Sequence, residues 1–413
     1  MSQSNPHPIS VIRLTAAGRS AVAVLLVEGP GALGVLDGLI HGKNVRNLLP
    51  QRPEGCFAQK VPDTFSAPGD RLVVGRFADA SRGRDSGEDV VVRCRSEDSV
   101  ELHCHGGTAA TARIEQALVG RGCRIVDWKD WIRAGGEPDP IRGEARLALA
   151  RAETAQTAAV LLDQHQGALA AAIRSILALF GDDAETSSTS AARQIETLLG
   201  WSDFGRHLVE PWRVVLAGRP NVGKSTLINA LVGYSRAIVH HAPGTTRDVL
   251  TAATALEGWP VELVDTAGLR ATDHPIEQVG VALAEEELQA ADLVLLLFDA
   301  SRTWCDDDRQ LARRWPSALM VHNKIDLAGQ TSDGPSSRRP EGCLTSAIQG
   351  RGIEELAVEI GRRLVPEKPA AGAGVPFTAR QVEVLQAARK HIDEKDSKAA
   401  AAVLAELLSR TGG

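Results

Sequence analysis

One short segment of the sequence, from Gly218 to Thr226, combines the residue types that bind phosphate. It reads Gly-Arg-Pro-Asn-Val-Gly-Lys-Ser-Thr and fits the pattern G-x-x-x-x-G-K-[ST]. In this pattern the glycines let backbone N–H groups surround the phosphates, the lysine reaches the β- and γ-phosphates, and the hydroxyl ligates Mg²⁺. A strand pattern precedes the segment and a helical pattern follows it, which is the context that such a loop needs. We therefore predict a phosphate site made of Gly218, Asn221, Val222, Gly223, Lys224, Ser225 and Thr226.

A second motif, Asp265-Thr-Ala-Gly268, follows the apolar segment 261–264. A carboxylate at the end of a strand can hold Mg²⁺ through water, and the glycine can offer a backbone N–H to the γ-phosphate and act as the pivot of a switch. Between the two motifs, a threonine of residues 244–248 can complete the Mg²⁺ coordination when a nucleoside triphosphate is bound. Thr245 and Thr246 are both candidates, and we favour Thr246. The predicted nucleotide contacts here are Thr245, Thr246, Asp265, Thr266, Ala267 and Gly268, with Ser225, Thr246 and Asp265 around Mg²⁺.

The segment Asn323-Lys324-Ile-Asp326 predicts the base that is bound. An ionised aspartate accepts hydrogen bonds only, so it can take both the N1–H and the exocyclic amine of guanine, whereas adenine offers neither there. Asn323 and Lys324 brace the base pocket, and Ser346-Ala347 can close over the base with a backbone N–H. These motifs predict GTP and GDP as ligands and argue against an ATP-driven motor or kinase.

The residue that orients the attacking water is less obvious. In many GTPases a glutamine follows the glycine of the second motif, but Leu269 stands there and cannot orient water. Glu277, just before a helical pattern, is a candidate for this role. The local sequence also fits a solvated carboxylate at a helix start, which the helix dipole favours, so both interpretations remain open. Lys224 and Thr246 are the other catalytic candidates.

The elements that position these residues alternate between strand and helix, which predicts a doubly wound, mostly parallel sheet with helices on both faces. Each motif follows a strand, at the edge where such sheets bind ligands. An α/β pattern over 11–127 precedes this region. Ala/Leu-rich helical patterns flank it over 144–180, where we expect one or two long helices, and over 378–410. We also expect a loop at 181–192, a short helix at 193–201 and a surface loop at 329–342. The strands and helices expected around the motifs are 213–217, 225–232, 261–264, 276–290, 293–298, 318–322, 343–345 and 353–364; those expected before them are the strands 22–27, 90–94, 99–103 and 123–126 and the helix 108–120.

Composition sets outer limits on the function. A chain of 413 residues predicts two to four domains, and a net charge of -6 argues against electrostatic binding of nucleic acid over the whole surface, although a local basic patch could hold RNA. The six cysteines are scattered, as expected for reduced thiols in a cytosolic protein. Residues Met1–Ser10 have no apolar signal core, and the longest apolar run, 293–298, is too short for a bilayer. We expect a cytoplasmic protein without a membrane partner.

Residues 211–365 resemble the G domain of the tRNA-modifying GTPase family MnmE, also called TrmE. The resemblance rests on Gly218–Thr226, Pro243-Gly-Thr-Thr-Arg-Asp248, Asp265-Thr-Ala-Gly-Leu-Arg270 and Ile276-Glu-Gln-Val-Gly280. It implies that Glu277 orients the attacking water and that Asn221 ligates K⁺. In the family this cation takes the place of an arginine finger when two G domains meet, where charge builds on the β–γ bridge.

The flanking regions resemble the same family through Ser96–Gly107, Arg146-Leu-Ala-Leu149 and Ala152-Glu153. The resemblance implies a dimerising, folate-binding α/β domain over 1–127, a discontinuous helical domain over 128–208 and 369–413, and a G domain inserted at 209–368. It further implies a homodimer that modifies the wobble uridine of tRNA with a flavoprotein of the MnmG kind. The family's folate contacts correspond to Leu26, Glu101 and Arg146, with 5-formyltetrahydrofolate as the cofactor.

Two departures from the family pattern define an alternative. The family ends in Cys-x-x-Gly-Lys, which serves the modification chemistry, whereas this sequence reads Ser409-Arg-Thr-Gly-Gly413 and has no cysteine after Cys343. Leu26 stands where the family has a folate-binding arginine. The first hypothesis is a tRNA wobble-uridine modification GTPase, and the second is a regulatory or ribosome-associated GTPase on an MnmE-derived scaffold that has lost this chemistry.

Overall fold

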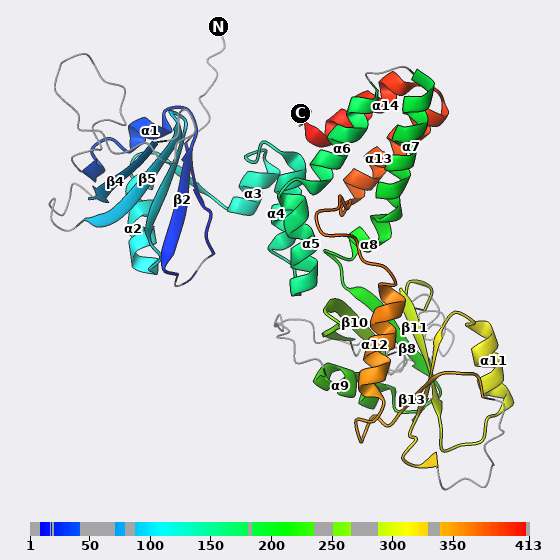
Figure 1. The fold of residues 1–413 in the computed structure, drawn as a ribbon. Coiled ribbons are helices and arrows are strands. Elements are labelled where there is room, and N and C mark those ends of the chain that lie inside the picture. The colour runs from blue at the N-terminus through cyan, green and yellow to red at the C-terminus, as the bar shows by residue number, and fades with distance from the viewer. Residues whose placement is uncertain are drawn as a thin grey trace, which may run out of the picture. The chain divides into compact units, whose positions relative to one another are not determined.

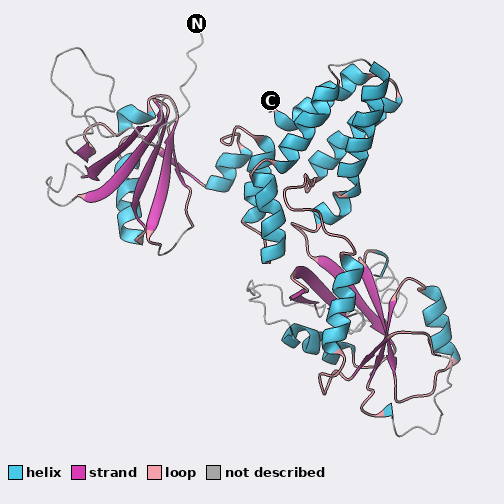
Figure 2. Cartoon of the chain, in the orientation of Figure 1, coloured by secondary structure: helices cyan, strands magenta, loops and turns pink. Residues whose placement is uncertain are grey.

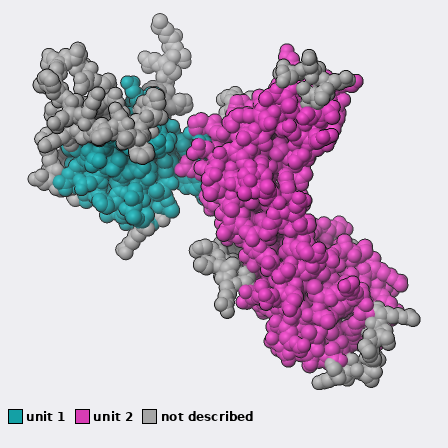
Figure 3. Space-filling model, in the orientation of Figure 1, with its two compact units in different colours: residues 1–137 teal, residues 138–413 magenta. Residues whose placement is uncertain are grey.

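The fold was taken from a computed structural model, drawn as a ribbon in Figure 1 and by secondary structure in Figure 2. The structure describes residues 9–16, 18, 20–41, 71–78, 87–180, 184–234, 251–265, 288–328 and 339–409, with the backbone alone for residues 71 and 184–187. The chain forms two compact units, Met1–Glu137 and Pro138–Gly413 (Figure 3). No helix in these ranges is both long and apolar enough to span a bilayer.

The first unit is built on one mostly antiparallel sheet. Its strand order is β3-β4-β5-β6-β2-β1-β7, and only the β1–β7 pair among them is parallel. The strands are β1 (Ser10–Arg13), β2 (Val22–Glu28), β3 (Ile40–His41), β4 (Arg71–Phe77), β5 (Glu88–Ser96), β6 (Ser99–His105) and β7 (Arg124–Val126), and the helices are α1 (Ala32–Val35), α2 (Thr108–Val119) and α3 (Trp128–Arg133).

The two faces of this sheet differ because side chains alternate along each strand. In β5, Val90 and Val92 join the apolar core with Ile114 and Leu118 of α2, whereas Val91 points away from that core and remains 38% exposed. One face is therefore packed against helices, and the opposite face carries exposed side chains.

The helical part of the second unit combines segments from both ends of its chain. It contains α4 (Pro140–Leu149), α5 (Ala155–His165), α6 (Ala168–Leu179), α7 (Ala184–Gly200), α8 (Ser202–Arg206), α13 (Ala379–Asp393) and α14 (Ser397–Leu408). Side chains tie the distant segments together: Glu144 accepts hydrogen bonds from Arg380 Nε at 2.7 Å and from Gln381 Nε2 at 2.6 Å. The fully buried Gln164 donates to Ala373 O at 3.0 Å.

The second sheet lies between the chain segments that form those helices. Its order is β13-β12-β11-β8-β10-β9, and all neighbouring pairs are parallel except β9–β10. Helices α9 and α12 pack on the face that continues into the helical core, and α11 covers the other face. The elements are β8 (Trp212–Gly218), α9 (Lys224–Tyr234), β9 (Thr251–Leu256), β10 (Trp259–Asp265), β11 (Leu293–Asp299), α11 (Asp306–Arg314), β12 (Leu319–Asn323), β13 (Cys343–Thr345) and α12 (Ile353–Leu364).

The turn of the β9–β10 hairpin meets the helical part. Glu257 and Gly258 have φ values of 50° and 82°, so both adopt the left-handed conformation of a tight hairpin turn. Gln156 Nε2 of α5 donates to Glu257 O at 3.0 Å, and a Cβ on Gly258 would come within 2.5 Å of that nitrogen. Phe204 packs edge-on against Trp259 with ring centroids 5.4 Å apart. One continuous apolar core therefore runs through the helices and the sheet.

A polar contact joins the same two parts beside β8 and β11. His207 is 1% exposed, stacks on Trp212 and has its Nε2 3.2 Å from Asp292 Oδ1, while Arg213 N donates to Asp292 Oδ2 at 2.7 Å. Burial raises the pKa of Asp292, but the hydrogen bonds from His207 and Arg213 outweigh it and leave the pKa below its ordinary value. The charged form of Asp292 therefore stabilises this junction.

The structure corrects two expectations of secondary structure. The predicted loop at 181–192 is wrong because α7 already begins at Ala184, and the segment 144–180 holds parts of three helices instead of one or two. Thr154 caps α5 with its side chain, and Gly167 (φ 104°) begins α6, so the helical pattern breaks twice. Most of the predicted helix 276–290 and of the surface loop 329–342 lies outside the described residues.

Candidate nucleotide site

The phosphate loop connects the buried strand β8 to helix α9. Gly218 (φ 150°) and Gly223 (φ 95°) both adopt conformations that side chains disfavour. A Cβ at Gly218 would lie 2.5 Å from Leu297 O, and one at Gly223 would lie 2.5 Å from Asn323 Nδ2. The loop therefore needs glycine at these two positions for close packing against β11 and β12.

Lys224 begins α9 and is only 6% exposed. Its Nζ donates to Gly218 O at 3.2 Å and to Arg219 O at 3.4 Å, so the ammonium is held inside the loop. A cation beside the first turn of a helix attracts phosphate together with the free N–H groups there.

Ser225 and Asp265 meet at the mouth of the loop. Ser225 Oγ donates to Asp265 Oδ2 at 2.6 Å, and Asp265, at the end of β10, is fully buried. A hydroxyl and a carboxylate are hard oxygen ligands of the type that Mg²⁺ takes from P-loop proteins. These two residues therefore fit a Mg²⁺ ion beside the phosphate loop.

Asn323 joins the phosphate loop to the two predicted base-binding segments, residues 323–326 and 346–347, which together are called the base loop. It ends β12 and is 1% exposed. Its Nδ2 donates to Val222 O at 3.0 Å, while its Oδ1 accepts from Thr345 Oγ1 at 3.2 Å and from Ala347 N at 3.1 Å. One buried amide therefore connects three segments of the predicted site.

Lys324 follows with a left-handed backbone conformation, φ 68°. Its Nζ donates to Asn221 O at 2.6 Å and lies 2.8 Å from Asp299 Oδ2 at the end of β11. Burial raises the pKa of Asp299, but the hydrogen bonds from Lys324 and Ser301 outweigh it, so the pKa lies below its ordinary value. Asp299 was not among the residues predicted from the sequence, although it ends an apolar strand as Asp265 and Asn323 do.

The remaining base-site candidates lie in the turns that follow. Asp326 is half-buried in the turn after Lys324, and Ser346 is fully buried. Ser346 N donates to Arg351 O at 2.9 Å, which fixes the backbone of the Ser346-Ala347 loop. Asn221 and Thr226 are exposed. The candidates outside the described residues are Thr245, Thr246, Thr266, Ala267, Gly268 and Glu277.

The folate candidates of the first unit have a different environment. Glu101 is 4% exposed, and its carboxylate lies 2.5 Å from Arg95 NH2, 3.4 Å from Arg93 NH1 and 3.4 Å from His103 Nε2. Leu26, its neighbour across the β2–β6 pair, is 1% exposed. Arg146 lies in α4 of the second unit.

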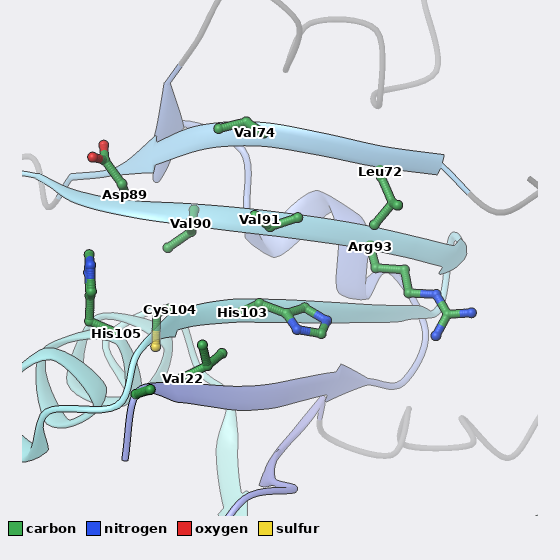
Figure 4. A pocket seen from close by; sticks show the side chains of 11 residues that line it. Val22, Leu72, Val74, Asp89, Val90, Val91, Arg93, His103, Cys104 and His105 are labelled. Atoms are coloured by element: carbon green, nitrogen blue, oxygen red, sulfur yellow. The ribbon is translucent and has the colours of Figure 1, made fainter. Parts of the chain in front are cut away.

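A cavity of about 620 Å³ lies on the open face of the first sheet (Figure 4). The exposed apolar side chains Val22, Leu72 and Val74 line it, with exposed fractions of 51%, 62% and 70%. His103 and Arg93 point into the same region from β6 and β5. The lining is completed by Ala21, Asp89, Val90, Val91, Cys104 and His105.

Three features thus lie at the carboxyl ends of neighbouring strands: a phosphate loop, a serine–aspartate pair and an asparagine–lysine motif. Residues 213–324 match the family model "50S ribosome-binding GTPase". The protein is a P-loop GTPase, an enzyme that hydrolyses GTP. It is 33% identical to tRNA modification GTPase MnmE of Symbiobacterium thermophilum, over 92% of this chain and 87% of that protein. It is also 32% identical to the tRNA modification GTPase MnmE of Geobacter sulfurreducens, over 84% of this chain and 79% of that protein. The chain belongs to the MnmE family.

Among solved structures, the G domain of the T. maritima FeoB iron transporter is similar to part of the chain. The sequences are 26% identical, the match covers 37% of this chain and 99% of that one, and the TM-score is 0.28.

Proposed function

We propose that this GTPase converts GTP and water to GDP and phosphate as one step of the modification of the wobble uridine in tRNA. The observation that carries the proposal is the Asn323 bridge between the phosphate and base loops, in a chain similar over most of its length to tRNA modification GTPases. The proposal includes guanine selection by Asp326, because Asp326 lies in the turn that directly follows the bridging residue Asn323.

The proposed domain plan is an α/β domain over 1–127, a helical domain over 128–208 and 369–413, and a G domain inserted at 209–368. The first compact unit extends further than this α/β domain, because it runs to Glu137 and includes α3. Support for the insertion comes from the hydrogen bonds of Glu144 to Arg380 and Gln381, which join helices on either side of the second sheet in the sequence. The contacts of α13 and α14 with α6 and α7 are consistent with one helical domain.

The proposed mechanism assigns each group to one task. Lys224 binds the β- and γ-phosphates, and Ser225, Thr246 and Asp265 hold Mg²⁺, which neutralises phosphate charge when bound. Asn221 would hold K⁺, and a cation bound there would offset the negative charge that develops in the transition state. Glu277 orients the water. As the water oxygen bonds to the γ-phosphorus, the bond from the γ-phosphorus to the bridging oxygen breaks and GDP leaves with the electron pair. One proton of the water passes to an oxygen of the phosphate that forms.

We further propose a homodimer formed through the first unit, which acts in the cytoplasm with tRNA and a flavoprotein of the MnmG kind. The open sheet face supports this assignment, because Val22, Leu72 and Val74 are exposed together beside a cavity. Contiguous apolar patches on a soluble protein are typical of interaction sites.

The residues do not fit 5-formyltetrahydrofolate in the manner implied by the family. Arg95, Arg93 and His103 already surround the carboxylate of Glu101, so it has little capacity left for a pterin. Leu26 supplies no positive charge for a folate carboxylate. We derive no reaction step through a folate.

This mismatch is the observation that favours a second candidate function, a regulatory or ribosome-associated GTPase on an MnmE-derived scaffold. Folate binding separates the two. Tight binding of 5-formyltetrahydrofolate to the purified protein would favour the modification role, and absence of binding would favour the second candidate.

The direct test is mass spectrometry of nucleosides from bulk tRNA. Strains that lack the gene are compared with the same strains carrying the wild-type gene or the Lys224→Ala variant. We expect a C5-substituted wobble uridine to disappear in the deletion and to return only with the wild type. An unchanged nucleoside profile in a cell with no second copy would contradict the proposal and support the alternative.

A further inference from the structure

Asp299 presents a carboxylate that hydrogen bonds within the chain hold in place. Its Oδ1 accepts hydrogen bonds from Ser301 N at 3.0 Å and from Ser301 Oγ at 2.5 Å. The side chain is only 8% exposed. Because both bonds reach Oδ1, the orientation of the carboxylate is set and Oδ2 is directed elsewhere.

The backbone that carries Asp299 is also held. Arg339 NH1 donates to Asp299 O at 3.3 Å, and Arg339 NH2 donates to Ala300 O at 3.3 Å and to Arg302 O. A guanidinium that binds successive carbonyls fixes the path of a turn. The turn after β11 is therefore rigid compared with a free loop end.

Oδ2 of Asp299 lies against one cation in particular. The distance to Lys324 Nζ is 2.8 Å, whereas Arg302 Nε is 3.6 Å away and its side chain is 71% exposed. Lys324 Nζ also donates to Asn221 O at 2.6 Å. The lysine thus spans from the end of β11 to the phosphate loop.

We propose that Asp299 is a positioning residue for nucleotide binding. It holds the Lys324 ammonium against Asn221 O and so keeps the phosphate loop and the base loop in a fixed position relative to each other. The inference rests on the proposed assignment of these two loops to GTP. Asp299 touches neither of the reacting groups in this scheme. It acts by lowering the conformational freedom that binding would otherwise have to remove.

The first test is the Asp299→Asn variant, measured for GDP affinity and release with a fluorescent GDP. We expect the dissociation constant to rise about tenfold, mainly through faster release. Turnover at saturating GTP should stay within about twofold of the wild type, because catalysis needs no contact with Asp299. The matched control is Asp306→Asn, which removes the same charge from an exposed position on α11. It should leave GDP affinity, GDP release and turnover unchanged.

A double-mutant cycle tests whether Asp299 acts through the lysine. In a Lys324→Met background, Asp299→Asn should have no further effect on GDP affinity. Additive losses in the double variant, or an affinity of Asp299→Asn within twofold of the wild type, would overturn the inference.

Two measurements keep the test decisive. Thermal melting of the nucleotide-free variants shows whether they fold. If Asp299→Asn does not fold, Ser301→Ala replaces it and should weaken GDP binding by about threefold. Unchanged GDP binding by Ser301→Ala would overturn the inference. A wild-type protein that binds no guanine nucleotide would instead refute the proposed function.

Discussion

Replacement of Asn323 by alanine is the most direct test of how the site is assembled. The side chain makes three hydrogen bonds, to Val222 O, Thr345 Oγ1 and Ala347 N, at distances of 3.0 to 3.2 Å. It is 1% exposed, so water does not readily replace the lost partners. The variant should loosen the phosphate loop and the base loop relative to each other.

The size of the effect follows from these contacts. A hydrogen bond of this kind contributes about 1 kcal/mol net, so the three bonds together hold the loops with about 3 kcal/mol. The apparent affinity falls with the fraction of molecules in the competent arrangement. Since about 1.4 kcal/mol corresponds to a factor of ten, GDP should bind about 100-fold more weakly to Asn323→Ala.

The assay is titration calorimetry or fluorescence with GDP, with Thr345→Val as a graded comparison. Thr345→Val removes one of the three bonds and should weaken GDP binding by about fivefold. An Asn323→Ala protein that is folded and binds GDP within threefold of the wild type would refute the bridging role.

Three further expectations concern catalysis and stability. Glu277→Ala should lower turnover by about 100-fold or more without changing GDP affinity, as expected for a water-orienting group, and unchanged turnover would leave Glu277 as a solvated carboxylate. GTP hydrolysis should be faster in KCl than in NaCl, and Asn221→Ala should remove the difference; equal rates in the wild type would contradict the K⁺ site. Asp292→Asn should lower the free energy of unfolding, measured with urea at pH 7, by about 2 kcal/mol, because hydrogen bonds to a charged group are lost or weakened. Because the pKa of Asp292 is lowered in the folded protein, this stabilisation is fully present above the unfolded pKa of about 3.9 and is lost as the pH falls through the folded pKa. The free energies of unfolding of the wild type and Asp292→Asn should therefore converge in acid.

The parallel part of the second sheet could be predicted from the sequence because its strands are continuous apolar runs that end in a motif. The strand β11 (Leu293–Asp299) is an example, because six buried apolar residues precede Asp299 at the edge of the sheet where the nucleotide site is predicted. The expected segments 343–345 and 353–364 agree with β13 and α12. Apolar runs of this length favour buried strands, and the motifs fix which of their ends carries the site.

Other features had no local signal. Strand β9 reads Thr-Ala-Ala-Thr-Ala-Leu, which has no strong strand propensity, and it forms through antiparallel pairing with β10. Helix α7 begins in a polar Ser/Thr-rich segment and forms because Ala191 and Ile195 are buried against neighbouring helices. The role of Asp299 depends on Lys324, which is distant in the sequence, so only the folded chain reveals the pair.

The apolar core that continues from the helices into the second sheet has a consequence for how this unit melts. Domains joined by a narrow linker unfold in separate steps, whereas parts that share a packed interior lose it together. Phe204 and Trp259 belong to one cluster that reaches from α4 to α14. Calorimetry of residues 138–413 should therefore give a single heat-absorption peak, and a G domain cut out at its predicted limits should expose Trp259 and be prone to aggregate.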